Sequence, residues 1–387
     1  CWGWCFLTKI QIFRSKKSID LATLVDSRLL ICSNSGGGKS YAIRKLLEET
    51  HGKVMAIVLD IEGEFKTLRE EFDFLLIGER GDVSLSIKSA HLLPKKLLEL
   101  NVSTIIDISD LKKNDRVQYV KKFLDALMEC PRELWKPCIV VLDEVHTLCG
   151  QQEKQDSTFS VIDLCTRGRK RGFCPVLCTQ RIAKLHKDAA AEMNNIMIGR
   201  TGLDIDMKRA AEILGFTNKK DMLSLRDLEA GEFYVFGPAI ARAVEKEKVA
   251  EVKTTHPKIG MDIRGKIVPP TPKIRSMLQK LNDLPQEVER DLKEKKDLHG
   301  EISRLQMELR KKDSAVPPDY GHKVQQEREQ YNKARAEWEK NERQMRQTFK
   351  LAQEKINSIK KIVGTEIILP VLKEIKVENP APPQKKA

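Results

Sequence analysis

The chain has 387 residues, of which 41% are hydrophobic and 32% are charged, and its formal net charge is +13. This length exceeds what one hydrophobic core usually organises, and no apolar run approaches the roughly 20 residues that cross a bilayer, so we expect a large cytoplasmic domain with an appended element and no membrane span. The positive charge favours a polyanionic partner, most often nucleic acid, over a merely soluble basic surface.

Residues 1–28 form the first predicted segment, a lead-in that contains the strand-like run TKIQIF. The chain begins at Cys1 without an initiator Met. Two interpretations stay open, a truncated N-terminus that once carried more sequence and a boundary that was set wrongly.

A glycine-rich stretch follows, ICSNSGGGKSYAIRKLLEE from Ile31 to Glu49. Glycine allows several backbone N–H groups to turn toward one anion, and the N-terminus of the next helix adds positive potential. We expect Lys39 to reach the β- and γ-phosphates of ATP and Ser40 to ligate Mg²⁺. The phosphate-loop pattern asks for Gly where Ser33 stands, but a small residue can still make the tight turn. The predicted nucleotide-binding residues are Ser33, Asn34, Ser35, Gly36, Gly37, Gly38, Lys39 and Ser40.

Short apolar runs alternate with amphipathic helical patterns along residues 29–255, as parallel α/β sheets require. Such a run closes the domain as a predicted edge strand at 231–237. Nine cysteines without paired metal-ligand spacing indicate small core residues in a reducing compartment. The sequence therefore predicts an α/β, doubly wound, parallel-dominated sheet with the phosphate loop after its first core strand. The other strand-like runs are 29–32, 54–60, 103–108, 138–143 and 175–180.

The run CIVVLDEVHTL ends an apolar strand in Asp143 and Glu144, which places both carboxylates at the ligand-binding rim of the sheet. Asp143 suits the binding of hydrated Mg²⁺, and Glu144 suits the polarisation of an attacking water. We expect the phosphate loop and these carboxylates on successive core strands. The run PVLCTQ ends in Thr179 and Gln180, a polar pair placed to sense the γ-phosphate or position the water.

A basic cluster, CTRGRKRGF, precedes that last strand and contains Arg167, Arg169, Lys170 and Arg171. A solvated face is the usual role of such a cluster. Beside a nucleotide site, an arginine can instead reach the neighbouring subunit's site and stabilise transition-state charge, and the cluster could equally contact DNA phosphates.

The phosphate loop, the LDE strand end, the GRKRG segment and the TQR that follows resemble the HerA–FtsK superfamily of DNA-pumping ATPases, as does VLDIEGEF at 58–65. The resemblance covers about residues 29–253. It implies a RecA-like P-loop NTPase core that uses ATP and Mg²⁺, with Arg169 and Gln180 acting in hydrolysis. It also implies a homo-oligomeric, generally hexameric ring that moves duplex DNA. The N-terminal β-barrel with which HerA proteins dock a nuclease is not visible in residues 1–28, so a nuclease partner is in doubt.

Two alternatives share this chemistry. One is a conjugation- or secretion-type ATPase that moves another polymer, and the other is an ATP-dependent switch in a DNA-processing or defence complex. A chromosome-organising coiled-coil ATPase is disfavoured, because there the coiled coil separates the phosphate loop from the Asp-Glu strand, whereas here both precede the helical region.

The C-terminal part is predicted as a linker at 256–273, an antiparallel coiled-coil hairpin at 274–363 and a mostly disordered tail at 364–387. The hairpin would present a surface for a protein partner. A single helix or a disordered charged tail is the alternative. Apolar residues recur every seven positions in its second half, at Val324, Tyr331, Trp338, Met345, Ala352 and Ile359.

Overall fold

The computed structural model describes residues 9–152, 155–257, 268–281, 289–290, 293, 297–298, 300–308 and 318–363. The chain divides into two compact units, residues 1–292 and residues 293–387. Within the described ranges, no helix combines the length and the apolar character needed to cross a membrane.

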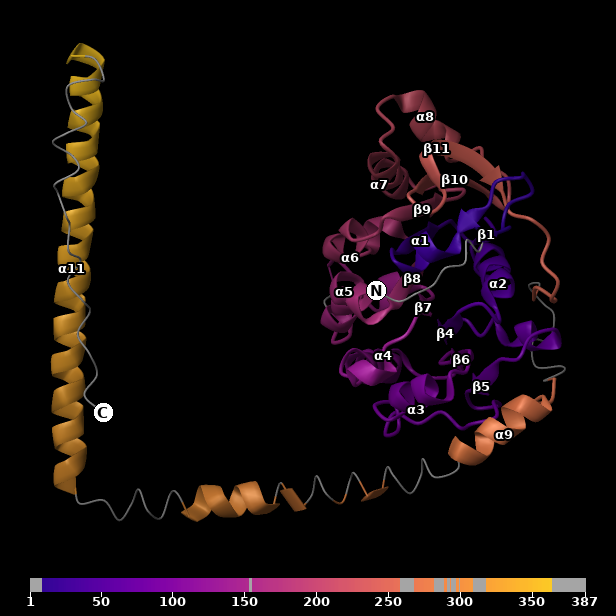
Figure 1. Ribbon diagram of the computed structural model, residues 1–387, viewed down its shortest axis with the longest axis horizontal. Helices are drawn as coiled ribbons and strands as arrows, with labels where there is room; N and C mark the ends of the chain where they lie inside the picture. Colours follow the sequence, from indigo (N-terminus) through magenta and orange to yellow (C-terminus); the bar gives the residue numbers. More distant parts are fainter. Residues whose placement is uncertain are drawn as a thin grey trace. The chain divides into compact units, whose positions relative to one another are not determined.

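The first unit is built on a nine-stranded sheet in the order β11-β10-β9-β3-β8-β7-β4-β6-β5 (Figure 1). All neighbours from β9 to β5 are parallel, and β10 and β11 join antiparallel, which confirms the predicted parallel-dominated α/β sheet. The strands are β3 (Leu29–Cys32), β4 (Met55–Asp60), β5 (Leu75–Ile77), β6 (Thr104–Asp107), β7 (Cys138–Leu142), β8 (Phe173–Thr179), β9 (Asn195–Ile198), β10 (Glu232–Gly237) and β11 (Ala241–Lys248).

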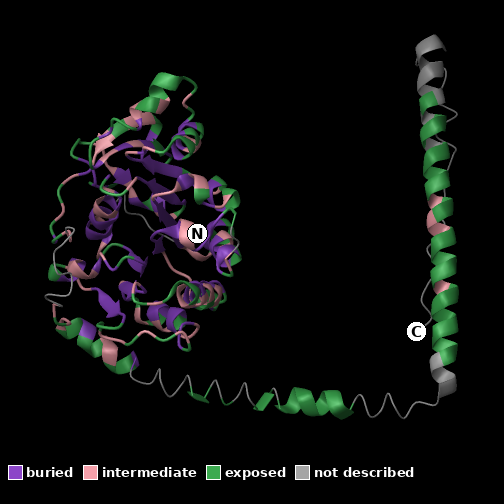
Figure 2. Ribbon diagram, turned by 180° about the vertical axis from the view of Figure 1, so that it is seen from behind, coloured by how far each residue is buried: buried purple, intermediate pink, exposed green. Residues whose placement is uncertain are grey.

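Helices cover both faces of this sheet, and Figure 2 shows its strands as the buried layer between them. Apolar side chains of α1 and α2 form the core on one face, together with the small β1–β2 sheet (Lys9–Ile10, Ile19–Asp20). Side chains of α3, α4, α5 and α7 form the core on the other. The central strands are apolar on both faces, because both are covered. The helices are α1 (Leu21–Val25), α2 (Lys39–Thr50), α3 (Leu93–Leu100), α4 (Lys113–Met128), α5 (Thr158–Arg167), α6 (Lys187–Ala191), α7 (Asp204–Leu214) and α8 (Lys219–Ser224).

Two expectations about strand position were wrong. The strand predicted at the edge, β10, is internal, because β11 pairs with it and takes the edge. The phosphate-loop strand β3 and the carboxylate strand β7 are not neighbours, since β8 lies between them. This order places the end of β8, and therefore Gln180, between the loop and the carboxylates.

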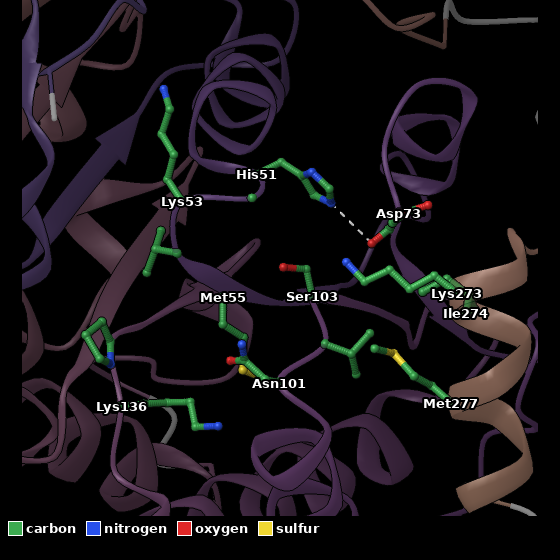
Figure 3. A pocket seen from close by; sticks show the side chains of 14 residues that line it. His51, Lys53, Met55, Asp73, Asn101, Ser103, Lys136, Lys273, Ile274 and Met277 are labelled. Carbon is green, nitrogen blue, oxygen red and sulfur yellow. Dashed lines mark hydrogen bonds between the residues drawn. The ribbon is translucent and has the colours of Figure 1, made fainter.

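Helix α9 (Pro272–Leu281) belongs to the first unit and packs in its core, although its residues from 274 onward were predicted to belong to the arm. Ile274 is 0% exposed and Leu281 is 3% exposed, and both join the core cluster of α3 and α4. In Figure 3, Ile274 and Met277 face a pocket that Met55 and Ser103 line from the amino ends of β4 and β6. The arm therefore starts beyond α9.

The second unit contains one long helix, α11 (Pro318–Val363), of 46 residues. Val324 is 56% exposed and Met345 is 37% exposed, so these members of the predicted apolar seam face solvent in the single chain. The coiled-coil hairpin stays a prediction. Residues 258–267 of the predicted linker and the predicted tail at 364–387 lie outside the described residues.

Candidate nucleotide-binding site

The phosphate loop joins the end of β3 to the first residue of α2, Lys39. Gly38 has a φ of +98° and Gly36 a φ of +70°, a left-handed backbone that favours glycine. A Cβ on Gly38 would lie 2.6 Å from the backbone nitrogen of Gly231, whose N–H donates to the Gly37 carbonyl at 3.0 Å. The glycines are therefore needed both for the turn of the phosphate loop and for the close approach of Gly231, the residue before β10, to that loop.

Ser33, where the family pattern asks for glycine, is fully buried, and its hydroxyl donates to the Arg200 carbonyl at 3.3 Å. A Cβ on Gly37 would lie 2.0 Å from this hydroxyl oxygen, and a Cβ on Gly199 would lie 2.8 Å from it. The Ser33 side chain thus occupies space that two glycines leave free. The departure from the pattern is accommodated without opening the loop.

Lys39 joins the loop to the carboxylates at the end of β7. Its Nζ lies 2.8 Å from Glu144 Oε1 and forms an ion pair with Asp143. Lys39 is 5% exposed, Glu144 3% and Asp143 0%, so the three charges meet away from water. The structure brings together the predicted phosphate-binding lysine, metal-binding aspartate and water-polarising glutamate.

Glu144 is held on three sides. Gln180 Nε2 donates to Glu144 Oε1 at 2.7 Å, and His146 Nδ1 lies 3.2 Å from Glu144 Oε2. His146 Nδ1 also lies 3.0 Å from Thr179 Oγ1, so the second residue of the predicted polar pair acts on Glu144 directly and the first through His146. Sequence reasoning missed His146, although it stands two residues after Glu144. A left-handed φ of +41° at Glu144, rare for a residue with a side chain, marks local strain at this corner.

The carboxyl groups of Asp143 and Glu144 have opposite pKa shifts. Burial, reinforced by the charge of Glu144, raises the pKa of Asp143 to about 6 and outweighs the attraction of Lys39. Burial would also raise the pKa of Glu144, but hydrogen bonds from His146, Lys39 and Gln180 lower it to about 2. Asp143 Oδ2 is buried and has no hydrogen-bond partner within the described part of the chain. A hard divalent cation prefers such an oxygen, so Asp143 fits Mg²⁺.

One pocket of about 410 Å³ opens over the phosphate loop. Lys39, Ser40 and Gln180 line it, as do Asn34, Ser35, Gly36 and Gly38 from the loop. Ser33 and Gly37 lie buried beneath the loop instead. Other parts of the chain line the rest of the pocket, and sequence reasoning did not identify them: Arg14, Tyr41, Glu64, Ala230, Gly231, Lys248, Val249, His256 and Pro257.

Arg169 lies away from this pocket. It is exposed in a short 3-10 helix, Gly168–Arg171, which precedes β8, whereas Gln180 follows β8. Seven residues of strand at about 3.3 Å each separate the two ends by roughly 20 Å. Within one chain, Arg169 therefore does not reach the nucleotide site. Arg171 is held elsewhere, over the Trp135 ring at 5.1 Å.

Comparison with known proteins gives two family matches. Residues 13–138 match the family described as "Helicase HerA, central domain", and residues 91–217 match the family described as "Zonular occludens toxin (Zot)". A probable helicase of Methanocaldococcus jannaschii is 24% identical over 166 residues, which are 43% of this chain and 32% of the relative. The chain thus spans about a third of the length of that relative.

Several solved structures share a weaker likeness. The genome packaging NTPase B204 of Sulfolobus turreted icosahedral virus 2, in complex with ATP-gammaS, is 15% identical, with 58% of this chain and 98% of that one covered at a TM-score of 0.42. VirB4 of Thermoanaerobacter pseudethanolicus is 13% identical, with 58% and 90% covered at a TM-score of 0.44. The plasmid coupling protein TrwB, in complex with GDPNP, is 11% identical, with 65% and 96% covered at a TM-score of 0.44.

Proposed function

We propose that this chain is a HerA-like P-loop ATPase of the HerA–FtsK superfamily and that it hydrolyses ATP with Mg²⁺; the match of residues 13–138 to the HerA central domain and the similarity to a probable helicase support this proposal. The observation that supports the proposal most is the buried cluster at the mouth of the phosphate loop. Lys39, Asp143, Glu144 and Gln180 come from three different elements and meet within hydrogen-bond distance. Phosphoryl transfer to water needs a phosphate-binding cation, a metal ligand and a water-orienting group, and these residues supply all three.

Each residue has a distinct role in the proposed reaction. Ser40 and Asp143 would hold Mg²⁺, which would neutralise charge on the phosphates when bound. Lys39 would leave Glu144 to meet the β- and γ-phosphates. Because Lys39 is one of the groups that lower the pKa of Glu144, its departure makes this carboxylate more basic and better able to accept a proton from water. Gln180 would keep the Glu144 carboxylate oriented while Lys39 moves from Glu144 to the phosphates.

We propose further that ATP hydrolysis drives a homo-oligomeric ring, with a hexamer favoured, along duplex DNA in the cytoplasm. The net charge of +13 supports a polyanionic track. A conjugation- or secretion-type motor for another polymer, or a switch without translocation, is the alternative. The C-terminal arm is the proposed site for a protein partner, and a nuclease partner is not assigned.

Arg169 is the proposed trans-acting arginine finger. Because it lies roughly 20 Å from Gln180 of its own chain, it can serve only a neighbour's nucleotide. Arg169→Ala subunits should bind ATP normally and hydrolyse it about 10³-fold more slowly. Mixing them with Glu144→Gln subunits should restore part of the activity, since some interfaces then pair an intact Glu144 with an intact Arg169. Flat activity at every ratio, with subunit exchange confirmed, would remove the finger from the proposal.

The experiment that tests the whole proposal is ATP turnover with and without duplex DNA, together with the mass of the protein in solution. Stimulated turnover by an oligomer supports the DNA motor. An ATP turnover rate that does not change when DNA is added favours the motor for another polymer. Slow turnover by a monomer favours the switch without translocation. The Glu144→Gln variant provides the control, because it should retain ATP and lose turnover. If this variant fails to bind ATP, Glu144 has a structural role instead.

A further inference from the structure

The pocket extends beyond the phosphate loop to a segment that follows β11. We call this segment, residues 252–256, the strap. Its backbone is fixed to α2 and to the 3-10 helix Lys66–Glu70. The Val252 N–H donates to Tyr41 Oη at 3.0 Å, and the Thr255 N–H donates to Glu70 Oε2 at 2.7 Å. Between them, the buried Glu48 carboxylate accepts from two strap N–H groups at 2.9 Å and from the Thr254 hydroxyl at 2.7 Å.

This attachment matters because α2 begins at Lys39, the phosphate-binding lysine. A strap fixed to α2 keeps a constant position relative to the phosphate loop. His256, the last strap residue, consequently lies in the lining of the nucleotide pocket, with its ring edge-to-face against Tyr41 at 5.8 Å between centroids. Arg14, from the N-terminal segment, also lines the pocket. Its backbone N–H donates to the Lys248 carbonyl at 2.8 Å.

Two buried polar atoms in this part of the pocket have no hydrogen-bond partner among the described residues. They are Glu64 Oε2 and His256 Nδ1. Burial, and then the charge of Arg44, lowers the pKa of His256, so the imidazole is neutral at pH 7. A buried polar atom without a partner costs free energy comparable to a lost hydrogen bond, which a bound ligand can recover.

We propose that Glu64, His256 and Tyr41 form the nucleoside-binding end of the pocket. A ligand whose phosphates occupy the loop must extend its sugar and base along the remaining lining. The Glu64 carboxylate accepts hydrogen bonds only, and ribose hydroxyls donate them; acidic side chains bind ribose in this way in other nucleotide sites. The His256 and Tyr41 rings, which are perpendicular to each other, supply aromatic surface for the base. The inference deepens the proposed function and rests on its phosphate site.

The first test compares two nucleotides on one substitution. By calorimetric titration in the presence of Mg²⁺, Glu64→Ala should weaken the binding of ATP by about 10-fold, the effect of losing a hydrogen bond to a charged group. The same substitution should leave the affinity for 2′,3′-dideoxy-ATP unchanged, because that ligand has no ribose hydroxyl to donate. Glu62→Ala is the matched control, since Glu62 lies in the same loop and is exposed. Equal losses for both nucleotides, or no loss for either, would overturn the ribose contact.

The second test removes the nucleoside altogether. His256→Ala should weaken ATP binding by about 10-fold and leave the binding of Mg²⁺-tripolyphosphate unchanged. Lys253→Ala is the control, because Lys253 lies in the strap with an exposed side chain. If tripolyphosphate binding falls as strongly as ATP binding in the His256→Ala variant, His256 serves the phosphate end of the pocket and the inference is wrong. The wild-type protein separates the two proposals: failure to bind either ligand removes the nucleotide site itself, whereas equal affinity for both removes only its nucleoside end.

Discussion

Lys39 should stabilise the nucleotide-free fold as well as bind phosphate. It is the cation between two carboxylates, of which Asp143 is 0% exposed and Glu144 is 3% exposed. Removing one partner of a buried ion pair leaves an uncompensated charge and costs about 3–5 kcal/mol. Each kcal/mol lowers the melting temperature of a domain of 150–250 residues by about 2–4 °C. Lys39→Ala should therefore lower it by about 6–20 °C and abolish nucleotide binding or hydrolysis.

Thermal unfolding followed by circular dichroism, without nucleotide at pH 7.5, measures the effect. Adding Asp143→Asn to Lys39→Ala removes one of the two stranded charges, so the double variant should recover about half of the loss. Lys53→Ala is the control, because Lys53 lies just after the same helix and is exposed, so its replacement should change the stability by at most about 0.5 kcal/mol.

Two outcomes would refute this reasoning. A Lys39→Ala protein that melts within about 2 °C of the wild type would show that the cluster contributes little to the fold. A double variant that melts below Lys39→Ala would show that Asp143 stabilises the fold without needing its cation. Near-wild-type ATP turnover by Lys39→Ala would remove the active-site assignment itself.

Three further predictions concern pH, the domain boundary and the loop. Burial and the charge of Asp107 raise the pKa of Asp60 to about 7, and the pKa of Asp143 is about 6, so the folded state holds these protons more tightly than the unfolded state. The stability of the nucleotide-free protein should therefore fall as pH rises from about 4 to 7, with the lowered pKa of His256 offsetting part of the fall below pH 6.5, and a melting temperature that rises over this window would contradict the shifts. A fragment of residues 1–292 should melt like the full chain, whereas residues 1–267, which lose the buried Ile274 and Leu281, should be about 3–6 kcal/mol less stable by urea unfolding; equal stability would show that α9 is not part of the core. Gly37→Ala should abolish ATP binding in calorimetry, because the new Cβ would lie 2.0 Å from Ser33 Oγ, and Ser33→Gly should restore part of it; absence of rescue would mean that another contact forbids the side chain.

Five of the six strands that the sequence predicted are uniformly buried, although two short strands with the same burial, β5 and β9, were missed. β3 reads LLIC and β7 reads CIVVL, and every residue of both is buried, so each gives an unbroken apolar run between turn signals. β11 was missed because its sequence, ARAVEKEK, is mostly charged and its side chains are largely exposed or half-buried. An edge strand needs only backbone pairing to form, and β10 supplies it. An apolar run therefore predicts a buried strand, whereas a charged and exposed edge strand such as β11 leaves no such signal.

The candidate site divides in the same way. Its charged centre was predictable because Asp143 and Glu144 stand at the end of an apolar run and Lys39 follows a glycine-rich loop, so the local sequence places all three at the ligand-binding edge of the sheet. His256 and Gly231 were not predictable, because each is brought to the loop by a partner far away in sequence, His256 by the hydrogen bonds of the strap to Glu48 and Gly231 by its contact with Gly38. Ser33 gives the sharpest case. Taken alone it weakens the phosphate-loop pattern, yet Gly199, more than 160 residues later, leaves part of the space that its hydroxyl fills. A departure from a local motif can thus be compensated by a residue that only the folded sheet, with β9 beside β3, brings into contact with it.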